Sequence, residues 1–186
     1  ENKYEYSSFG HLKSLKHLSI DVRGVRERSY LKDFFGFLNE KVAPHKKLET
    51  LLIKGRLESG IDEETTNAMV HFLEACSKTL RKAYLEFGSS NGQDDSHLGD
   101  ICKSLCKLEK LQSLTLLVYR PDSESKGQLE ELTKIISRMK SLEELDFKIK
   151  DTNFDEKKLN RTLPVQLKKR SFGIDASDAV PFSISK

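Results

Sequence analysis

The stretch from Lys110 to Val118, KLQSLTLLV, has the pattern Leu-x-x-Leu-x-Leu-x-Val. Three other stretches carry nearly the same pattern: SLKHLSIDV at 14–22, KLETLLIKG at 47–55 and SLEELDFKI at 141–149. A fifth, TLRKAYLEF at 79–87, fits if Ala83 takes a leucine position. The first leucines of the five stretches are 33, 32, 31 and 31 residues apart. A fixed period of this length predicts a solenoid, in which each unit packs against its neighbours.

Each of these stretches reads as a strand that is followed by a turn and a helical pattern. Apolar residues at three- and four-residue spacing predict helices over about 30–42, 62–80, 94–108 and 129–139. Asp62 is the expected N-cap of the second helix, with Thr65 three residues later. Leu167, Phe172 and Ile174 indicate a degenerate sixth strand. Because a strand–helix–strand crossover returns on one side, the sequence predicts an α/β fold whose strands are parallel.

This repeated strand, turn and helix resembles the leucine-rich repeat family over residues 12–175, and its ribonuclease-inhibitor-like subclass in particular. The resemblance implies a horseshoe-shaped solenoid with a parallel sheet on the concave side and helices on the convex side. Two features depart from the family. The position after the strand, usually asparagine in the family, holds Arg23, Arg56, Gly88, Tyr119 and Lys150, and the period exceeds the usual ~20–29 residues.

The expected domain organisation is a single repeat domain that spans residues 1–186. Its five repeats would cover 12–47, 48–79, 80–110, 111–141 and 142–175, with an N-terminal cap at 1–11 and a C-terminal tail at 176–186. A terminal repeat has a neighbour on one side only, so its open edge needs a cover.

Alternate residues of each strand should face away from the helices, onto an open face of the sheet. In-register stacking predicts three rows on that face: Ser19, Leu52, Tyr84, Thr115 and Asp146; Asp21, Lys54, Glu86, Leu117 and Lys148; Arg23, Arg56, Gly88, Tyr119 and Lys150. At the centre we expect an exposed apolar and aromatic group ringed by charge, a composition typical of protein interfaces. The predicted partner-binding residues are Leu52, Lys54, Arg56, Tyr84, Glu86, Leu117, Tyr119 and Lys148. The alternative is that another segment, such as 176–186, covers this group.

Composition narrows the function classes. The formal charge is +3, from 32 basic and 29 acidic residues, which does not favour a nucleic-acid partner. No apolar run approaches the ~18–20 residues of a membrane span. The three cysteines, Cys76, Cys102 and Cys106, have no disulfide-like spacing and favour a reducing, intracellular and most simply cytoplasmic location. We interpret them as small buried side chains. The chain begins at Glu1, which favours a piece of a longer protein.

No sequence motif indicates catalysis. The patterns GxxxxGK[ST], GxGxxG, HExxH and GxSxG are absent, and the five histidines are spread over the cap and the first three repeats. We therefore predict a non-enzymatic scaffold that binds another protein on the open face, with no cofactor, metal or membrane association; the oligomeric state is left open.

Two alternative functions remain. Arg23 or Arg56 at strand ends would suit regulation of a small GTPase. A basic C-terminal third would suit nucleic acid: Lys148, Lys150, Lys157, Lys158, Lys168, Lys169 and Arg170.

Overall fold

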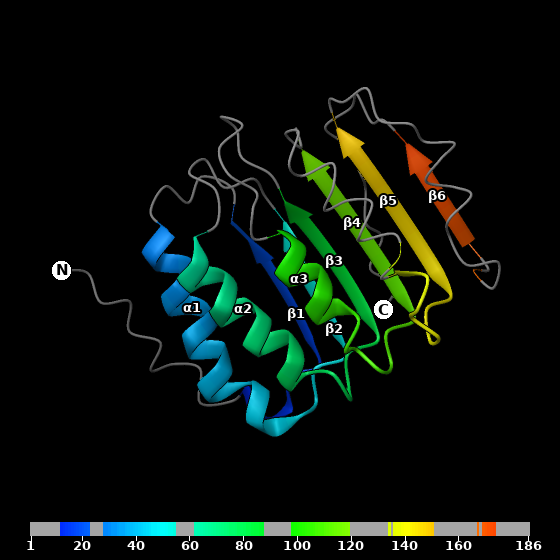
Figure 1. Ribbon diagram of the computed structural model, residues 1–186. Helices are drawn as coiled ribbons and strands as arrows, with labels where there is room; N and C mark the ends of the chain where they lie inside the picture. The colour runs from blue at the N-terminus through cyan, green and yellow to red at the C-terminus, as the bar shows by residue number, and fades with distance from the viewer. Residues whose placement is uncertain are drawn as a thin grey trace.

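The computed structural model describes residues 12–22, 28–54, 62–87, 98–119, 134, 136–150, 167 and 169–173. Figure 1 shows strands and helices that alternate along the first two thirds of the chain. The strands are β1 (His17–Asp21), β2 (Thr50–Lys54), β3 (Lys82–Phe87), β4 (Ser113–Tyr119), β5 (Glu144–Lys150) and β6 (Lys169–Gly173). The helices are α1 (Arg28–Lys41), α2 (Glu63–Ala75) and α3 (Leu98–Leu105), with short 3-10 helices η2 (Leu12–Ser14) and η3 (Ala43–His45).

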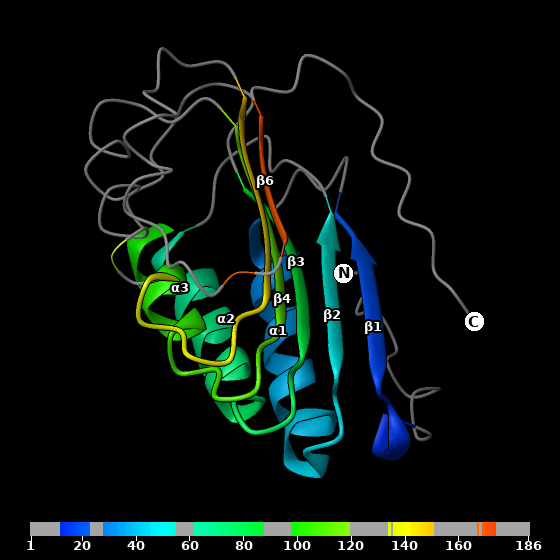
Figure 2. The ribbon, with the colours of Figure 1, turned by 90° about the vertical axis from the view of Figure 1, so that its right-hand side faces the viewer.

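The six strands form one sheet in sequence order, and every neighbouring pair is parallel. Helices α1, α2 and α3 all lie on one side of this sheet (Figure 2). The register follows the period of the sequence: Leu18 pairs with Leu51, Leu51 with Ala83, Ala83 with Leu114 and Leu114 with Leu145. The prediction of an α/β fold with a parallel sheet is therefore confirmed, and so is the sixth strand. The predicted cap 1–11 and tail 176–186 lie outside the described residues, as does most of the helix expected at 129–139.

The main hydrophobic core lies between the sheet and the helices. Leu51 and Leu85 project into it from β2 and β3 and are fully buried, as is Phe72 of α2. In β1, by contrast, Leu18 and Ile20 are only partly buried. An outermost strand has a neighbour on one side only, so its side chains lose less contact with water. Exposure still alternates along β1, whereas β2, inside the sheet, has three consecutive buried residues, Leu51 to Ile53.

Helix α2 begins at the predicted N-cap. The Asp62 side chain accepts a hydrogen bond from the backbone N–H of Thr65, with 2.8 Å between Oδ1 and N. Glu63 and Glu64 occupy the first turn, where the positive end of the helix dipole favours carboxylates. The Thr66 hydroxyl donates to the Asp62 carbonyl. Sequence and structure therefore agree on where this helix starts and why.

Asp62→Ala is expected to lower the free energy of unfolding by about 1 kcal/mol, because the Thr65 N–H loses its acceptor. Asp62→Asn keeps a side-chain oxygen at the cap and is expected to cost less. Urea unfolding followed by circular dichroism measures both values. Equal losses in the two variants would mean that the carboxylate charge, rather than the cap, stabilises the helix.

Candidate functional site

The face of the sheet away from α1, α2 and α3, here called the opposite face, carries the predicted rows. Ser19 pairs with Leu52, Leu52 with Tyr84, Tyr84 with Thr115 and Thr115 with Asp146. In the next row Asp21 pairs with Lys54, while Glu86 pairs with Leu117 and Leu117 with Lys148. The register expected for these two rows is confirmed for every pair that the structure describes.

Leu52, Tyr84 and Leu117 form a separate apolar cluster on the opposite face. Their exposed fractions are only 6%, 6% and 3%, so the expectation that these side chains are exposed is wrong. Neighbouring strands are ~4.8 Å apart, which brings large side chains on adjacent strands into contact. Leu52 and Tyr84 are direct cross-strand partners, and Leu117 lies diagonal to Tyr84 across β3 and β4. The alternative covering segment, 176–186, is outside the described residues.

Tyr84 connects the apolar cluster to charged neighbours. Burial raises the pKa of its phenol to about 12, and the nearby carboxylates of Glu86 and Asp146 act in the same direction. The Tyr84 hydroxyl donates a hydrogen bond to the Glu86 side chain, two residues along the same strand face. The phenol is therefore neutral over the physiological range and serves as a hydrogen-bond donor.

Asp146 and Lys148 form the charged side of this cluster on β5. Their closest charged atoms are 3.7 Å apart, and the side chains are 30% and 17% exposed. Among the described residues the buried Oδ1 of Asp146 has no hydrogen-bond partner. A buried carboxylate oxygen without a hydrogen-bond partner lowers the stability of the folded state. Asp146 was not among the predicted partner-binding residues, although its row position could have indicated it.

The remaining predicted partner-binding residues are placed less centrally. Lys54 and Glu86 are half-buried near the ends of β2 and β3. Tyr119 ends β4 beside Lys150 in the backbone register. Arg56 lies outside the described residues, as does Arg23, the other arginine of the GTPase hypothesis. Of the cations in the nucleic-acid hypothesis, Lys157, Lys158 and Lys168 also lie outside; Lys150, Lys169 and Arg170 lie on strands β5 and β6.

The cysteines are not all placed as predicted. Cys76 and Cys102 are buried, but Cys106 is exposed because it follows the last turn of α3, so the prediction is wrong for that residue. Burial raises the pKa of the Cys76 thiol to about 11, which keeps it protonated. In the part of the chain that the structure describes, no group of three His, Cys, Asp or Glu side chains could hold a metal ion. No helix within that part is long and apolar enough to cross a membrane.

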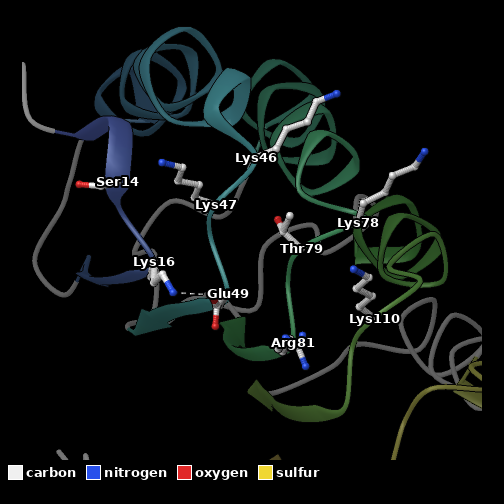
Figure 3. A pocket seen from close by; sticks show the side chains of 9 residues that line it. All are labelled: Ser14, Lys16, Lys46, Lys47, Glu49, Lys78, Thr79, Arg81 and Lys110. Atoms are coloured by element: carbon white, nitrogen blue, oxygen red, sulfur yellow. Dashed lines mark ion pairs between the residues drawn. The ribbon is translucent and has the colours of Figure 1, made fainter.

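A depression of about 370 Å³ lies at the edge of the sheet where strands β1 to β4 begin (Figure 3). The segments that lead into these four strands line it together. The lining contains five lysines, one arginine, one carboxylate and two hydroxyls: Lys16, Lys46, Lys47, Lys78, Lys110, Arg81, Glu49, Ser14 and Thr79. We call this the basic depression.

A ladder of backbone hydrogen bonds fixes the floor of the basic depression. One carbonyl in each segment accepts two N–H groups from the next, at 2.8 to 3.1 Å: Lys16 from Glu49 and Thr50, Glu49 from Arg81 and Lys82, and Arg81 from Gln112 and Ser113. This ladder sets Lys16, Glu49 and Arg81 in register on successive strands. The Lys16 ammonium contacts Glu49 at 3.1 Å and lowers the pKa of that carboxyl by hydrogen bonding and charge, and Arg81 adds to the effect.

Sequence reasoning missed the basic depression, although a signal for it is present. One or two residues before the first leucine of a repeat, the chain holds Lys13, Lys46, Lys47, Lys78, Lys110 or Lys140. These positions looked like ordinary turns between a helix and a strand. Only the stacking of the repeats shows that they come together at one edge.

No protein-family model, curated protein or solved structure matches this chain. The opposite face and the basic depression are therefore the two candidate sites of this chain.

Proposed function

We propose that the chain is a leucine-rich-repeat solenoid that acts as a non-enzymatic scaffold and binds a protein partner on the opposite face. The observation that supports this most directly is the one-sided arrangement of α1, α2 and α3 on a parallel sheet. Parallel sheets usually have both faces covered by helices. A face on which the described residues place no helix, with polar rows in register, is a surface on which an extended partner can be recognised.

The charges of this face fit a protein better than a polymer of one charge sign. Along one row the sequence of charges is Asp21, Lys54, Glu86, with Lys148 on β5 beyond Leu117. A nucleic acid would meet the carboxylates of this row and that of Asp146, whereas a protein segment can present both signs. We propose that these charged residues orient the bound partner. The apolar cluster of Leu52, Tyr84 and Leu117 packs between them on the same face.

Reversal of two charges on the opposite face tests this proposal. Asp21→Lys combined with Lys54→Glu preserves the net charge but inverts the pattern that a partner would read. The matched control is Asp100→Lys with Lys103→Glu, which inverts an exposed ion pair on α3. After capture and purification of a binding partner, its dissociation constant is measured for all three proteins.

We expect the Asp21 and Lys54 variant to bind at least tenfold more weakly, and the α3 control to bind like the wild type. Thermal unfolding of both variants should stay near that of the parent, because surface substitutions usually change stability by less than ~0.5 kcal/mol. Normal binding by the first variant with loss in the control would place the interface on the helices.

A further inference from the structure

The cations of the basic depression are largely uncompensated. The whole chain is nearly balanced, at +3, yet this one depression gathers five lysines and Arg81 against the single carboxylate of Glu49. Of the six cations that line the depression, only Lys16 has an ion-pair partner among the described residues, namely Glu49. Lys46, Lys47, Lys78, Arg81 and Lys110 are exposed. Like charges that share one depression repel one another, so a bound anion would stabilise their arrangement.

Helix termini explain only part of this charge. Lys46 and Lys78 follow α1 and α2, where the negative end of the helix dipole favours cations. Lys16 and Arg81 stand next to the first residues of β1 and β3, where no α-helix ends. The backbone ladder holds the main chain of Lys16 and Arg81 in register on neighbouring strands. The cations therefore come from four separate segments of the chain whose backbones are held side by side.

The lining indicates the class of ligand. Its described residues include no aromatic side chain, so they offer no surface on which a nucleobase could stack. The ammonium and guanidinium groups and the Ser14 hydroxyl are donors that suit phosphate oxygens, whereas the Thr79 hydroxyl already donates to the Cys76 carbonyl. A volume of about 370 Å³ is at the small end of the range for small-molecule sites.

Toward β5 and β6 the edge carries both signs of charge, with Lys140 before β5 and Lys169 at the start of β6. Glu109 precedes β4, and Glu143 and Glu144 stand at the start of β5. An extended polyanion that followed the edge toward β5 and β6 would meet these carboxylates. A compact anion would stay within the basic segments before β1 to β4.

We propose that the basic depression binds a compact small molecule that carries several phosphate groups, either free in solution or as the headgroup of a lipid. Lys47, Lys78, Arg81 and Lys110 contact its phosphates, with Arg81 able to hold one phosphate through two N–H groups. Glu49 opposes binding. This site is separate from the opposite face, so its failure would leave the proposed protein scaffold untouched.

Isothermal titration calorimetry of the full chain with inositol hexakisphosphate tests the site. Lys47→Gln, Lys78→Gln and Arg81→Gln together are expected to raise the dissociation constant at least tenfold. The control, Lys32→Gln, Lys103→Gln and Lys134→Gln, removes the same charge from exposed positions elsewhere and should change it less than threefold. Equal weakening in the two triple variants would mean non-specific attraction, which overturns the proposal.

Glu49→Gln is expected to strengthen binding, whereas the triple variant weakens it. It removes the only carboxylate of the lining and releases Lys16, so we expect inositol hexakisphosphate to bind about threefold or more tightly. A role of these residues in folding alone would predict no gain. Unchanged or weaker binding by this variant contradicts the assignment of Glu49.

Two further probes identify the source of the phosphates. Binding to vesicles with phosphatidylinositol 4,5-bisphosphate, but not to phosphatidylcholine vesicles, together with binding of the soluble probe, supports a lipid headgroup. Binding of the soluble probe alone supports a free ligand. A 20-nucleotide single-stranded DNA that binds more tightly than inositol hexakisphosphate would overturn the choice of a compact ligand.

Discussion

Phe72→Ala is expected to lower the free energy of unfolding by about 3–5 kcal/mol, among the largest effects of any single substitution in this chain. Phe72 is fully buried in the main core, between α1 and the sheet. Its ring lies 6.1 Å from that of Phe35, measured between centroids, so the substitution also removes an aromatic pair. The cavity left behind cannot close fully, because strands and helices on both sides are fixed by their own hydrogen bonds.

Urea denaturation followed by circular dichroism measures this loss. The control is Tyr30→Ala, since Tyr30 is a large aromatic residue of α1 that is 39% exposed. We expect the control to cost less than about 1 kcal/mol. If both variants lost the same stability, aromatic content of the helices rather than burial in the core would govern the energetics.

Tyr84→Ala is the second substitution with a large expected effect, about 3 kcal/mol of unfolding free energy. The sequence predicts an exposed Tyr84, and the loss of an exposed ring would leave thermal unfolding unchanged. The structure buries its ring against Leu52 and Leu117. For a chain of this length each kcal/mol corresponds to roughly 2–4 °C in the unfolding midpoint, so a drop of roughly 6–12 °C is expected.

Differential scanning calorimetry measures that drop, with two comparisons. Tyr84→Phe keeps the ring and loses only the hydrogen bond to Glu86, so it should lose about 1 kcal/mol. Thr115→Ala changes a half-buried neighbour in the same row and should cost less than Tyr84→Ala. An unfolding midpoint unchanged by Tyr84→Ala would show that the ring is exposed in solution and would restore it as a contact residue.

The burial of Tyr84 can also be tested by measuring the titration of its phenol. Its folded-state pKa is about 12, above the ordinary value of 10, because burial disfavours the phenolate. This shift contributes stability that is fully present below pH 10 and is lost as the pH rises toward 12. Absorbance at about 295 nm should therefore show a late-ionising tyrosine that is missing in Tyr84→Phe. A normal titration of every tyrosine would contradict the burial.

The sequence alone was sufficient for the arrangement of the strands. Leu51, Leu85 and Leu114 could be assigned to the core because strand residues alternate between two faces. The steps of 31 to 33 residues gave the cross-strand register, since each unit stacks on the one before. Asp62 could be recognised as a cap because capping depends on residues only three apart. These features depend on local spacing, which a sequence displays directly.

The tertiary structure alone decided which side chains of the opposite face are buried and which cations come together. Leu52 and Tyr84 look like surface residues in their own strands, yet both are buried in one cluster with Leu117, which comes from another repeat. Lys47, Arg81 and Lys110 belong to three different turns, each unremarkable by itself. The physical reason is the same in both cases. Periodicity tells which face a residue occupies, whereas exposure and local charge depend on the sum of neighbours that are more than 30 residues away in the chain.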